Sequence, residues 1–175
     1  MASTQLRVGL VGTGLAATPH LKGYLGRQDA RVTAVCDTDA ERGRQFAVAH
    51  GIEQVFTELD AMLPVVDLVD IATPTYLHAD MAGRAAAAGK HVHCEKPFCR
   101  SVREGAEAVA AAERSQVKLV VGETYVFLRS HLEARSLIDA GEIGRPLQIR
   151  MSQGNWIGRA VARIPTGPAD RRWRV

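Results

Sequence analysis

The chain has 175 residues, of which 46% are hydrophobic and 23% are charged, values typical of a folded globular chain rather than a disordered one. Its formal net charge is +3, yet residues 159–175 hold five arginines and one aspartate, so the rest of the chain carries 17 basic and 18 acidic side chains. A basic face for nucleic acid is therefore not expected, and no helix-turn-helix or aromatic RNA-binding pattern is present.

Apolar runs of strand length alternate with segments of helical periodicity. We expect strands over residues 6–11, 31–36, 54–56, 65–72, 91–94 and 117–121. We expect helices over residues 15–26, 38–50, 58–63, 76–88 and 101–115. This alternation predicts a parallel sheet covered by helices on both faces. With a glycine-rich first turn, it predicts a doubly wound α/β domain of the Rossmann type over residues 1–122.

Two of these helices begin at a sequence pattern typical of a capping box. The patterns are Thr38-x-x-Glu41 and Ser101-x-x-Glu104, in which the hydroxyl accepts a hydrogen bond from the third residue of the helix. We therefore expect Thr38 and Ser101 to be the N-caps.

The pattern changes after residue 122. Ser130-x-x-Glu133 predicts the start of another helix, and apolar residues at every second position predict a strand over 147–153. No further element is expected toward the end of the chain. We assign residues 123–175 to the start of a second domain.

The first turn, Gly12-Thr13-Gly14-Leu15-Ala16-Ala17, follows a strand directly and opens a helix. In such a turn the first glycine permits the tight bend, the second lets the backbone approach a pyrophosphate, and the small Ala17 lets the helix lie close to the strand. Exposed N–H groups at the helix start then bind the phosphates. The alternative is a plain strand-to-helix turn.

Asp37 follows the second strand, 23 residues after Gly14. A carboxylate at this place accepts hydrogen bonds from the adenosine ribose of a dinucleotide. Because it repels a 2′-phosphate, it favours NAD over NADP, although the nearby Arg42 could weaken that preference. The alternative role for Asp37 is that of a helix N-cap.

Two further turns follow strands whose carboxyl ends face the expected ligand cleft. In Ala72-Thr73-Pro74-Thr75, the proline favours an extended Thr73, although a structural turn explains the pattern equally well. In Glu95-Lys96-Pro97, the lysine could hold or deprotonate a substrate hydroxyl, Glu95 could orient it, and the peptide bond before Pro97 could be cis. A surface role for Lys96 is the alternative.

A metal site is not expected at the cluster of His91, His93, Cys94 and Glu95, because a strand directs the two histidines and the cysteine to opposite faces. The three cysteines, Cys36, Cys94 and Cys99, match no disulfide framework. We expect structural, reduced thiols and a cytoplasmic location. There is no signal-peptide pattern, and no apolar run approaches the ~20 residues that span a bilayer.

The motifs together resemble those of one family, which includes glucose-fructose oxidoreductases, inositol dehydrogenases and rhizopine-catabolism proteins. The specific stretches are residues 72–78 (ATPTYLH) and 88–97 (AGKHVHCEKP). The resemblance implies NAD(H) or NADP(H) as the cofactor and a sugar, cyclitol or similar polyol as the substrate. It implies that seven residues line the cofactor, namely Gly12, Gly14, Asp37, Thr73, Pro74, His78 and Glu95.

The resemblance further implies that Lys96 contacts the substrate hydroxyl and assists proton transfer. Tyr125 and Phe127 match an aromatic segment at the domain junction, and Tyr125 is a candidate substrate contact. Family members often carry an Asn and an Arg in this segment, where this chain has Thr124 and Val126.

Family members are also about twice as long, with a mixed α+β substrate domain that carries a catalytic Asp and His and usually forms the oligomer interface. We therefore expect this chain to hold the cofactor domain and the start of a truncated substrate domain, with weak NAD(H) binding and little turnover. Alternatives are a non-catalytic dinucleotide sensor or partner protein, an inactive fragment, and another Rossmann reductase.

Overall fold

The computed structural model describes residues 5–150 of the chain. Contacts within the chain separate two units, with the boundary after Glu123. The first unit contains a six-stranded sheet in the order β3-β2-β1-β4-β5-β6, and every neighbouring pair of strands is parallel. The predicted doubly wound α/β fold is therefore confirmed.

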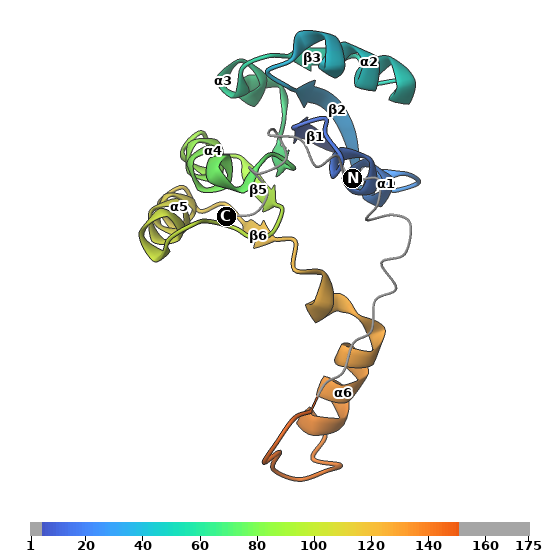
Figure 1. Ribbon diagram of the computed structural model, residues 1–175, viewed down its shortest axis with the longest axis vertical. Coiled ribbons are helices and arrows are strands. Elements are labelled where there is room, and N and C mark those ends of the chain that lie inside the picture. The colour runs from blue at the N-terminus through green and yellow to red at the C-terminus, as the bar shows by residue number, and fades with distance from the viewer. Residues whose placement is uncertain (1–4, 151–175) are drawn as a thin grey trace, which may run out of the picture. The chain divides into compact units, whose positions relative to one another are not determined.

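Strands and helices alternate along the first unit (Figure 1). The strands are β1 (Leu6–Val11), β2 (Ala30–Cys36), β3 (Gln54–Phe56), β4 (Leu68–Ile71), β5 (His91–Cys94) and β6 (Leu119–Val121). The helices are α1 (Ala17–Tyr24), α2 (Ala40–His50), α3 (Leu59–Met62), α4 (Thr75–Ala87) and α5 (Val102–Arg114), with a 3-10 turn, η1 (Leu63–Val65), after α3.

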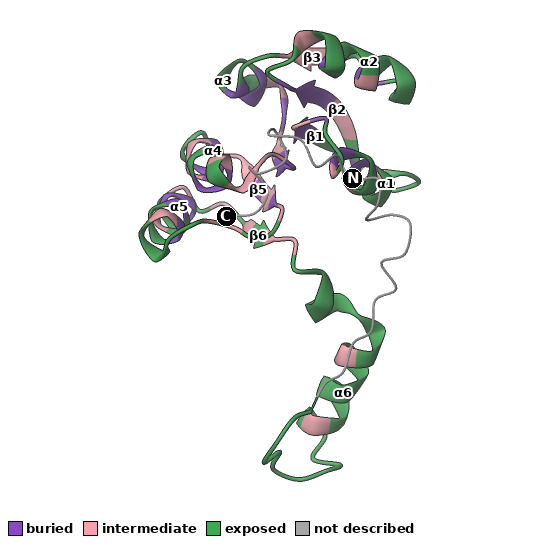
Figure 2. Cartoon of the chain, in the orientation of Figure 1, coloured by how far each residue is buried: buried purple, intermediate pink, exposed green. Residues whose placement is uncertain are grey.

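Two apolar clusters lie on the two faces of this sheet. Leu10 of β1 packs with residues of α1 and α2, such as Leu21 and Ala47. Val11, the next residue of β1, packs instead with residues of α3, α4 and α5, because successive strand residues point to opposite faces. Buried residues accordingly lie in the sheet and on the inner sides of the helices (Figure 2). Both faces are thus covered, as a parallel sheet requires.

Some expected boundaries are wrong. The first helix begins at Ala17 rather than at residue 15, and Leu15 is 95% exposed in the preceding turn. The expected strand over 65–72 is shorter, since its start forms the 3-10 turn that contains Pro64. The proposed cap Thr38 is also wrong, because the Asp39 carboxylate accepts the hydrogen bonds from the first turn of α2.

The N-cap predicted at Ser101 is confirmed, since the Ser101 hydroxyl accepts a 3.2 Å hydrogen bond from the backbone N–H of Glu104. The reciprocal half of the capping box differs, because the Glu104 carboxylate accepts from the N–H of Arg100. Replacing Ser101 by alanine should lower the free energy of unfolding by about 1 kcal/mol, the usual effect of losing an N-cap. Urea denaturation measures this, and Thr38→Ala is the matched control because Thr38 does not cap its helix. Equal losses in the two variants would contradict the assignment.

The second unit contains a 3-10 turn, η2 (Thr124–Phe127), and helix α6 (Arg129–Asp139). The N-cap of α6 is Leu128, which offers no side-chain acceptor, so the capping box predicted at Ser130 is wrong. The strand expected over 147–153 is also wrong in its described part, since residues 147–150 form no strand and residues 151–153 lie outside the described residues. A strand requires a hydrogen-bonded neighbour, and the described part of this unit contains none.

Across residues 5–150, none of the helices combines the length and the apolar character that crossing a bilayer demands.

Candidate functional site

Gly12 lies where the carboxyl ends of three strands meet. Its N–H donates a 2.8 Å hydrogen bond to the carbonyl of Cys36, which ends β2. Its φ is +87°, and a Cβ built on it would lie 2.8 Å from the carbonyl oxygen of Ala72, after β4. Both the left-handed backbone and the missing space require glycine here. The turn after β1 is therefore fixed against the ends of β2 and β4.

Thr13 joins this turn to Asp37. The Thr13 N–H and hydroxyl both donate to Oδ2 of Asp37, at 2.9 and 2.5 Å. Both residues are buried, with 7% and 5% of their surface exposed. The sequence places these two residues 24 positions apart, and the sheet brings them into direct contact.

The Asp37 carboxylate also binds the Arg42 guanidinium from α2. Nη2 and Nε of Arg42 donate to the two carboxylate oxygens at 2.6 and 3.0 Å, and the N–H of Asp39 donates to Oδ1 at 2.9 Å. Burial alone would raise the pKa of Asp37, but these hydrogen bonds and those of Thr13 outweigh it and lower the pKa to about 2. The carboxylate is therefore ionised at neutral pH. The alternative role of helix N-cap is wrong, because Asp39 holds that position.

Gly14 and the start of α1 form an open part of the turn. A Cβ on Gly14 would meet no atom within 4 Å. The N-cap, Ala16, has no side-chain acceptor for the first N–H groups of the helix. Ala17 is buried against the sheet in the cluster that contains Leu10. The open space over Gly14 and the uncapped helix start leave room for an anionic group.

His78 joins the two remaining turns. Its Nε2 lies 2.7 Å from the carbonyl oxygen of Thr73, and its Nδ1 lies 2.8 Å from that of Pro97. The peptide bond between Lys96 and Pro97 is cis, as the sequence allowed. Only 1% of His78 is exposed, and its two ring nitrogens hold the turns after β4 and β5 against each other. Pro74, half-buried, is the N-cap residue of α4.

Glu95 and Lys96 follow β5 at the same edge of the sheet. The Glu95 N–H donates to the carbonyl of Ile71, and its Oε1 lies 3.5 Å from Nε2 of His20. Lys96 is exposed, and among residues 5–150 its ammonium has no hydrogen-bond or ion-pair partner. Glu95 therefore contacts a histidine of α1, where the sequence suggested that it orients Lys96. Tyr125 belongs to the second unit and is 48% exposed in η2.

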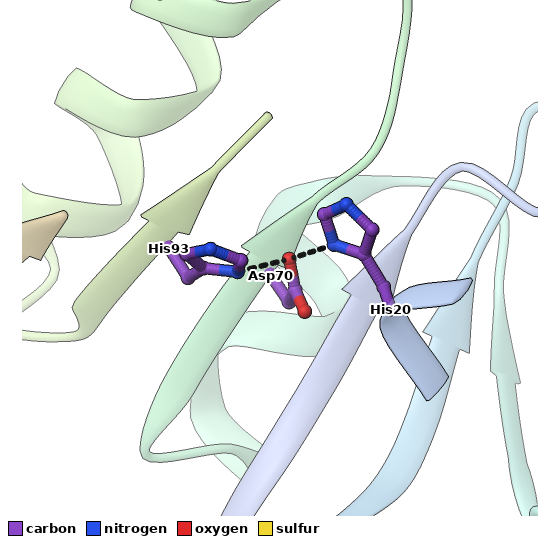
Figure 3. A group of neighbouring side chains, drawn as sticks. All are labelled: His20, Asp70 and His93. Atoms are coloured by element: carbon purple, nitrogen blue, oxygen red, sulfur yellow. Dashed lines mark hydrogen bonds and ion pairs between the residues drawn. The ribbon is translucent and has the colours of Figure 1, made fainter. Parts of the chain in front are cut away.

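A cluster that the sequence analysis missed lies below this edge. Nδ1 of His20 and Nδ1 of His93 both donate to Oδ1 of Asp70, at 2.8 and 2.9 Å (Figure 3). The Tyr24 hydroxyl donates to Oδ2 at 2.9 Å. The residues come from α1, β4 and β5, and Asp70 pairs with His93 across the neighbouring strands. A signal did exist, because an acidic residue inside a buried strand needs a partner.

The charges of this cluster are strongly coupled. Burial would raise the pKa of Asp70, yet hydrogen bonds from His20 and His93 lower it to about 2. The pKa of His20 is raised, chiefly by its hydrogen bond to Asp70, against the effect of burial. Burial, together with the Asp70 charge, raises the pKa of the Tyr24 hydroxyl. Asp70 is thus a buried anion surrounded by donors.

The buried cysteines do not contribute a reactive thiol to this edge. Burial raises the pKa of Cys36 to about 11 and that of Cys94 to about 12, with a further contribution from the charges of Asp37 and Asp70 respectively. Both side chains pack in the cluster under α3, α4 and α5. They therefore serve as small apolar core residues.

Residues 6–123 match the model of the Gfo/Idh/MocA oxidoreductases, described as an oxidoreductase family with an NAD-binding Rossmann fold. Among curated relatives, the inositol 2-dehydrogenase of Rhizobium meliloti is 34% identical over 139 residues, which is 79% of this chain and 42% of that protein. The chain spans between 39% and 44% of the length of the first curated relatives that it matches.

Solved structures of dehydrogenases also superpose on most of this chain and on less than half of their own length. The WlbA dehydrogenase from Bordetella pertussis, in complex with NADH and UDP-GlcNAcA, superposes with a TM-score of 0.74 at 30% identity, over 81% of this chain and 44% of that one. The scyllo-inositol dehydrogenase from Lactobacillus casei, with bound NAD(H) and scyllo-inositol, gives a TM-score of 0.74 at 26% identity, over 81% and 43%.

Proposed function

Since the chain belongs to the Gfo/Idh/MocA oxidoreductase family, whose Rossmann domain binds NAD, we propose that its first unit binds NAD(H) for hydride transfer to or from a sugar- or cyclitol-type substrate. The observation that carries the proposal is the turn of Gly12 and Thr13, fixed against Asp37 at the carboxyl edge of the sheet. In open α/β sheets this edge is where dinucleotides bind. The proposed substrate class is based on the similarity to inositol and scyllo-inositol dehydrogenases.

The first turn and the start of α1 would hold the pyrophosphate of the dinucleotide. The backbone from Gly12 to Ala16 is open to solvent at Gly14 and Leu15, and the first N–H groups of α1 have no side-chain cap. Such groups bind phosphate oxygens through the helix dipole and direct hydrogen bonds.

Asp37 would hold the adenosine ribose and so favour NAD over NADP. All its acceptor positions are taken by Thr13, Arg42 and Asp39 in the structure described here. Ribose hydroxyls can replace only the donor that moves freely, which is the half-exposed Arg42 side chain. We therefore propose that Arg42 turns away from Asp37 when NAD binds, and that it is the residue available to a 2′-phosphate when NADP binds.

The nicotinamide end would lie by the turns after β4 and β5, against Thr73, Pro74 and Glu95. When bound, the nicotinamide ring supplies the hydride acceptor or donor. Lys96 would contact the substrate hydroxyl and move its proton, and Glu95 would be held in place through His20. We also propose that residues 1–122 are the cofactor domain and residues 123–175 the start of a substrate domain, with Tyr125 as a substrate contact. Subunit association in the manner of a homo-oligomer is part of the same proposal.

Gly14→Ala tests the proposal without disturbing the fold. A methyl group at Gly14 meets no protein atom within 4 Å, so the free energy of unfolding should change by less than about 0.5 kcal/mol. The same methyl would stand where the pyrophosphate approaches, and we expect at least about a tenfold loss in NADH affinity by calorimetric titration.

Gly23→Ala is the matched control, since a Cβ there also meets nothing within 4 Å, but on the last turn of α1. It should bind NADH as the unmodified chain does. If Gly14→Ala retains full affinity, the dinucleotide does not approach this turn.

A further inference from the structure

Three ligand-type atoms from separate elements converge beneath the carboxyl edge of the sheet. One ligand atom each from His20, Asp70 and His93 lies within 4.8 Å of the other two. The two imidazole rings face each other across the carboxylate, with centroids 5.3 Å apart (Figure 3). Two histidines and one carboxylate are a usual ligand set for zinc sites that keep a position for water. We propose that His20, Asp70 and His93 bind one Zn²⁺ ion.

The distances from the two histidines to Asp70 require only a small adjustment for this. Both Nδ1 atoms lie 2.8 to 2.9 Å from Oδ1 of Asp70, as hydrogen bonds. Ligand atoms at about 2.1 Å from a tetrahedral zinc lie about 3.4 Å from each other, so each nitrogen moves outward by about half an ångström. The ion takes the place of the proton on each Nδ1. A neutral ring then carries its proton on Nε2, and a ring protonated on both nitrogens releases one proton to solvent.

The groups behind the three ligands have the arrangement that zinc sites use. Nε2 of His20 lies 3.5 Å from Oε1 of Glu95, which would orient a ring that binds metal through Nδ1. The Tyr24 hydroxyl donates to Oδ2 of Asp70 and leaves Oδ1 for the ion. Both supporting contacts already exist without the metal.

Charge and access also favour a divalent cation. The Asp70 carboxylate is 1% exposed, and Glu95 adds a second anion beside His20, so the two charges of the ion would be balanced. About a third of the His93 side chain is exposed, which gives the ion a path and leaves room for a water ligand. A Cβ at Gly122 would lie 3.2 Å from Nε2 of His93, so the glycine leaves space for this ring.

None of the three zinc ligands is among the residues proposed to contact the dinucleotide, although Glu95, which contacts His20, is proposed to lie by the nicotinamide. Zinc would tie α1 to β4 and β5 beneath the first turn, and its binding does not depend on whether the chain binds NAD(H). Failure of one proposal therefore leaves the other standing.

The experiment is a calorimetric titration of the full chain with ZnCl₂ after removal of metal by a chelator. We expect one site per chain with a Kd of about 1 µM or tighter. His93→Gln removes a partly exposed ligand and should weaken binding at least about 100-fold, while Tyr24→Phe, which keeps all three ligands, should weaken it about tenfold. His50→Gln is the control, because this exposed histidine lies at the end of α2 against Phe46, away from the three ligands.

Circular dichroism of the metal-free variants establishes that each one is folded before titration. Co²⁺ provides a second readout, because histidine coordination gives visible absorption bands that should vanish in His93→Gln. The absence of a saturable Zn²⁺ site overturns the proposal. Binding that is unchanged in His93→Gln and lost in His50→Gln also overturns it, since the ion would then occupy a surface histidine.

Discussion

Replacing Asp70 by alanine should lower the free energy of unfolding of the metal-free protein by about 3–5 kcal/mol, the usual cost of removing one partner of a buried charged pair. The carboxylate is 1% exposed and accepts from three side chains. Its loss leaves the donors of His20 and Tyr24 in a site where water reaches them poorly. Urea denaturation monitored by circular dichroism measures the change.

Asp67→Ala is the matched control. Asp67 precedes β4, and its pKa is also lowered to about 2, chiefly by its hydrogen bond to Arg7. Both side chains of that pair are substantially exposed, so water replaces the lost partner. We expect Asp67→Ala to lower the free energy of unfolding by only a small fraction of the loss in Asp70→Ala. Similar losses in the two variants would show that burial of the carboxylate is not the cause.

The Asp70 effect should also depend on pH. The folded-state pKa of Asp70 is lowered to about 2, so its contribution is present above about pH 4 and is lost as the pH falls toward 2. The pKa of His20 is raised, so its contribution is present below about pH 6.5 and is lost as the pH rises through its folded-state value. The difference in stability between the unmodified chain and Asp70→Ala should therefore be largest between about pH 4 and 6.5.

The sequence was sufficient for the sheet and most helices because their apolar periodicities are strong. The local details depended on contacts that periodicity does not contain. Thr38 and Asp39 are both good N-cap residues, and the choice falls on Asp39 because only its carboxylate reaches the N–H groups of Glu41 and Arg42. The strand expected from residue 147 failed for a different reason, since alternation creates a strand only beside a partner.

In the candidate site, too, the sequence predicts residues within local motifs but not contacts between distant segments. The sequence predicts Gly12 and Asp37 from their spacing along consecutive β-α-β units. It does not show that Asp37 anchors the first turn through Thr13, because a contact across 24 residues arises only from the sheet register. The Asp70 cluster was missed because its histidines lie 50 and 23 residues from the carboxylate. The prediction that His91 and His93 share one face agrees with the alternating burial of β5, but the partner of His93 is on β4.

Replacing Asp37 by alanine should reduce NADH affinity about 100-fold, because two ribose hydroxyl hydrogen bonds to a charged acceptor together contribute about 3 kcal/mol. The first turn also loses the anchor for the Thr13 N–H. Since the pKa of Asp37 is about 2, the carboxylate stays charged from about pH 5 upward, and its contribution to binding should not change with pH there. Calorimetric titration with NADH at several pH values measures both effects.

Asp39→Ala is the control that distinguishes loss of the ribose contact from destabilisation of the start of α2. Asp39 is two residues further on, caps α2 and lies half-exposed, without a proposed contact to the ribose. This variant should lose about 1 kcal/mol of stability and keep its NADH affinity. Equal loss of affinity in Asp37→Ala and Asp39→Ala would mean that the integrity of α2, and not the Asp37 carboxylate, controls binding.

The ratio of NADH affinity to NADPH affinity should also change in Asp37→Ala. With Asp37 present, a 2′-phosphate meets a buried, ionised carboxylate, and the Arg42 guanidinium must leave that carboxylate, to which it donates at 2.6 Å, before it can bind the phosphate. Removal of the carboxylate ends the repulsion and frees Arg42 to bind phosphate. The ratio of NADH to NADPH affinity should therefore fall in Asp37→Ala and rise again in Asp37→Ala/Arg42→Ala. A ratio that is the same in all three proteins would place the adenosine ribose away from Asp37, because no other change in the site distinguishes the two cofactors.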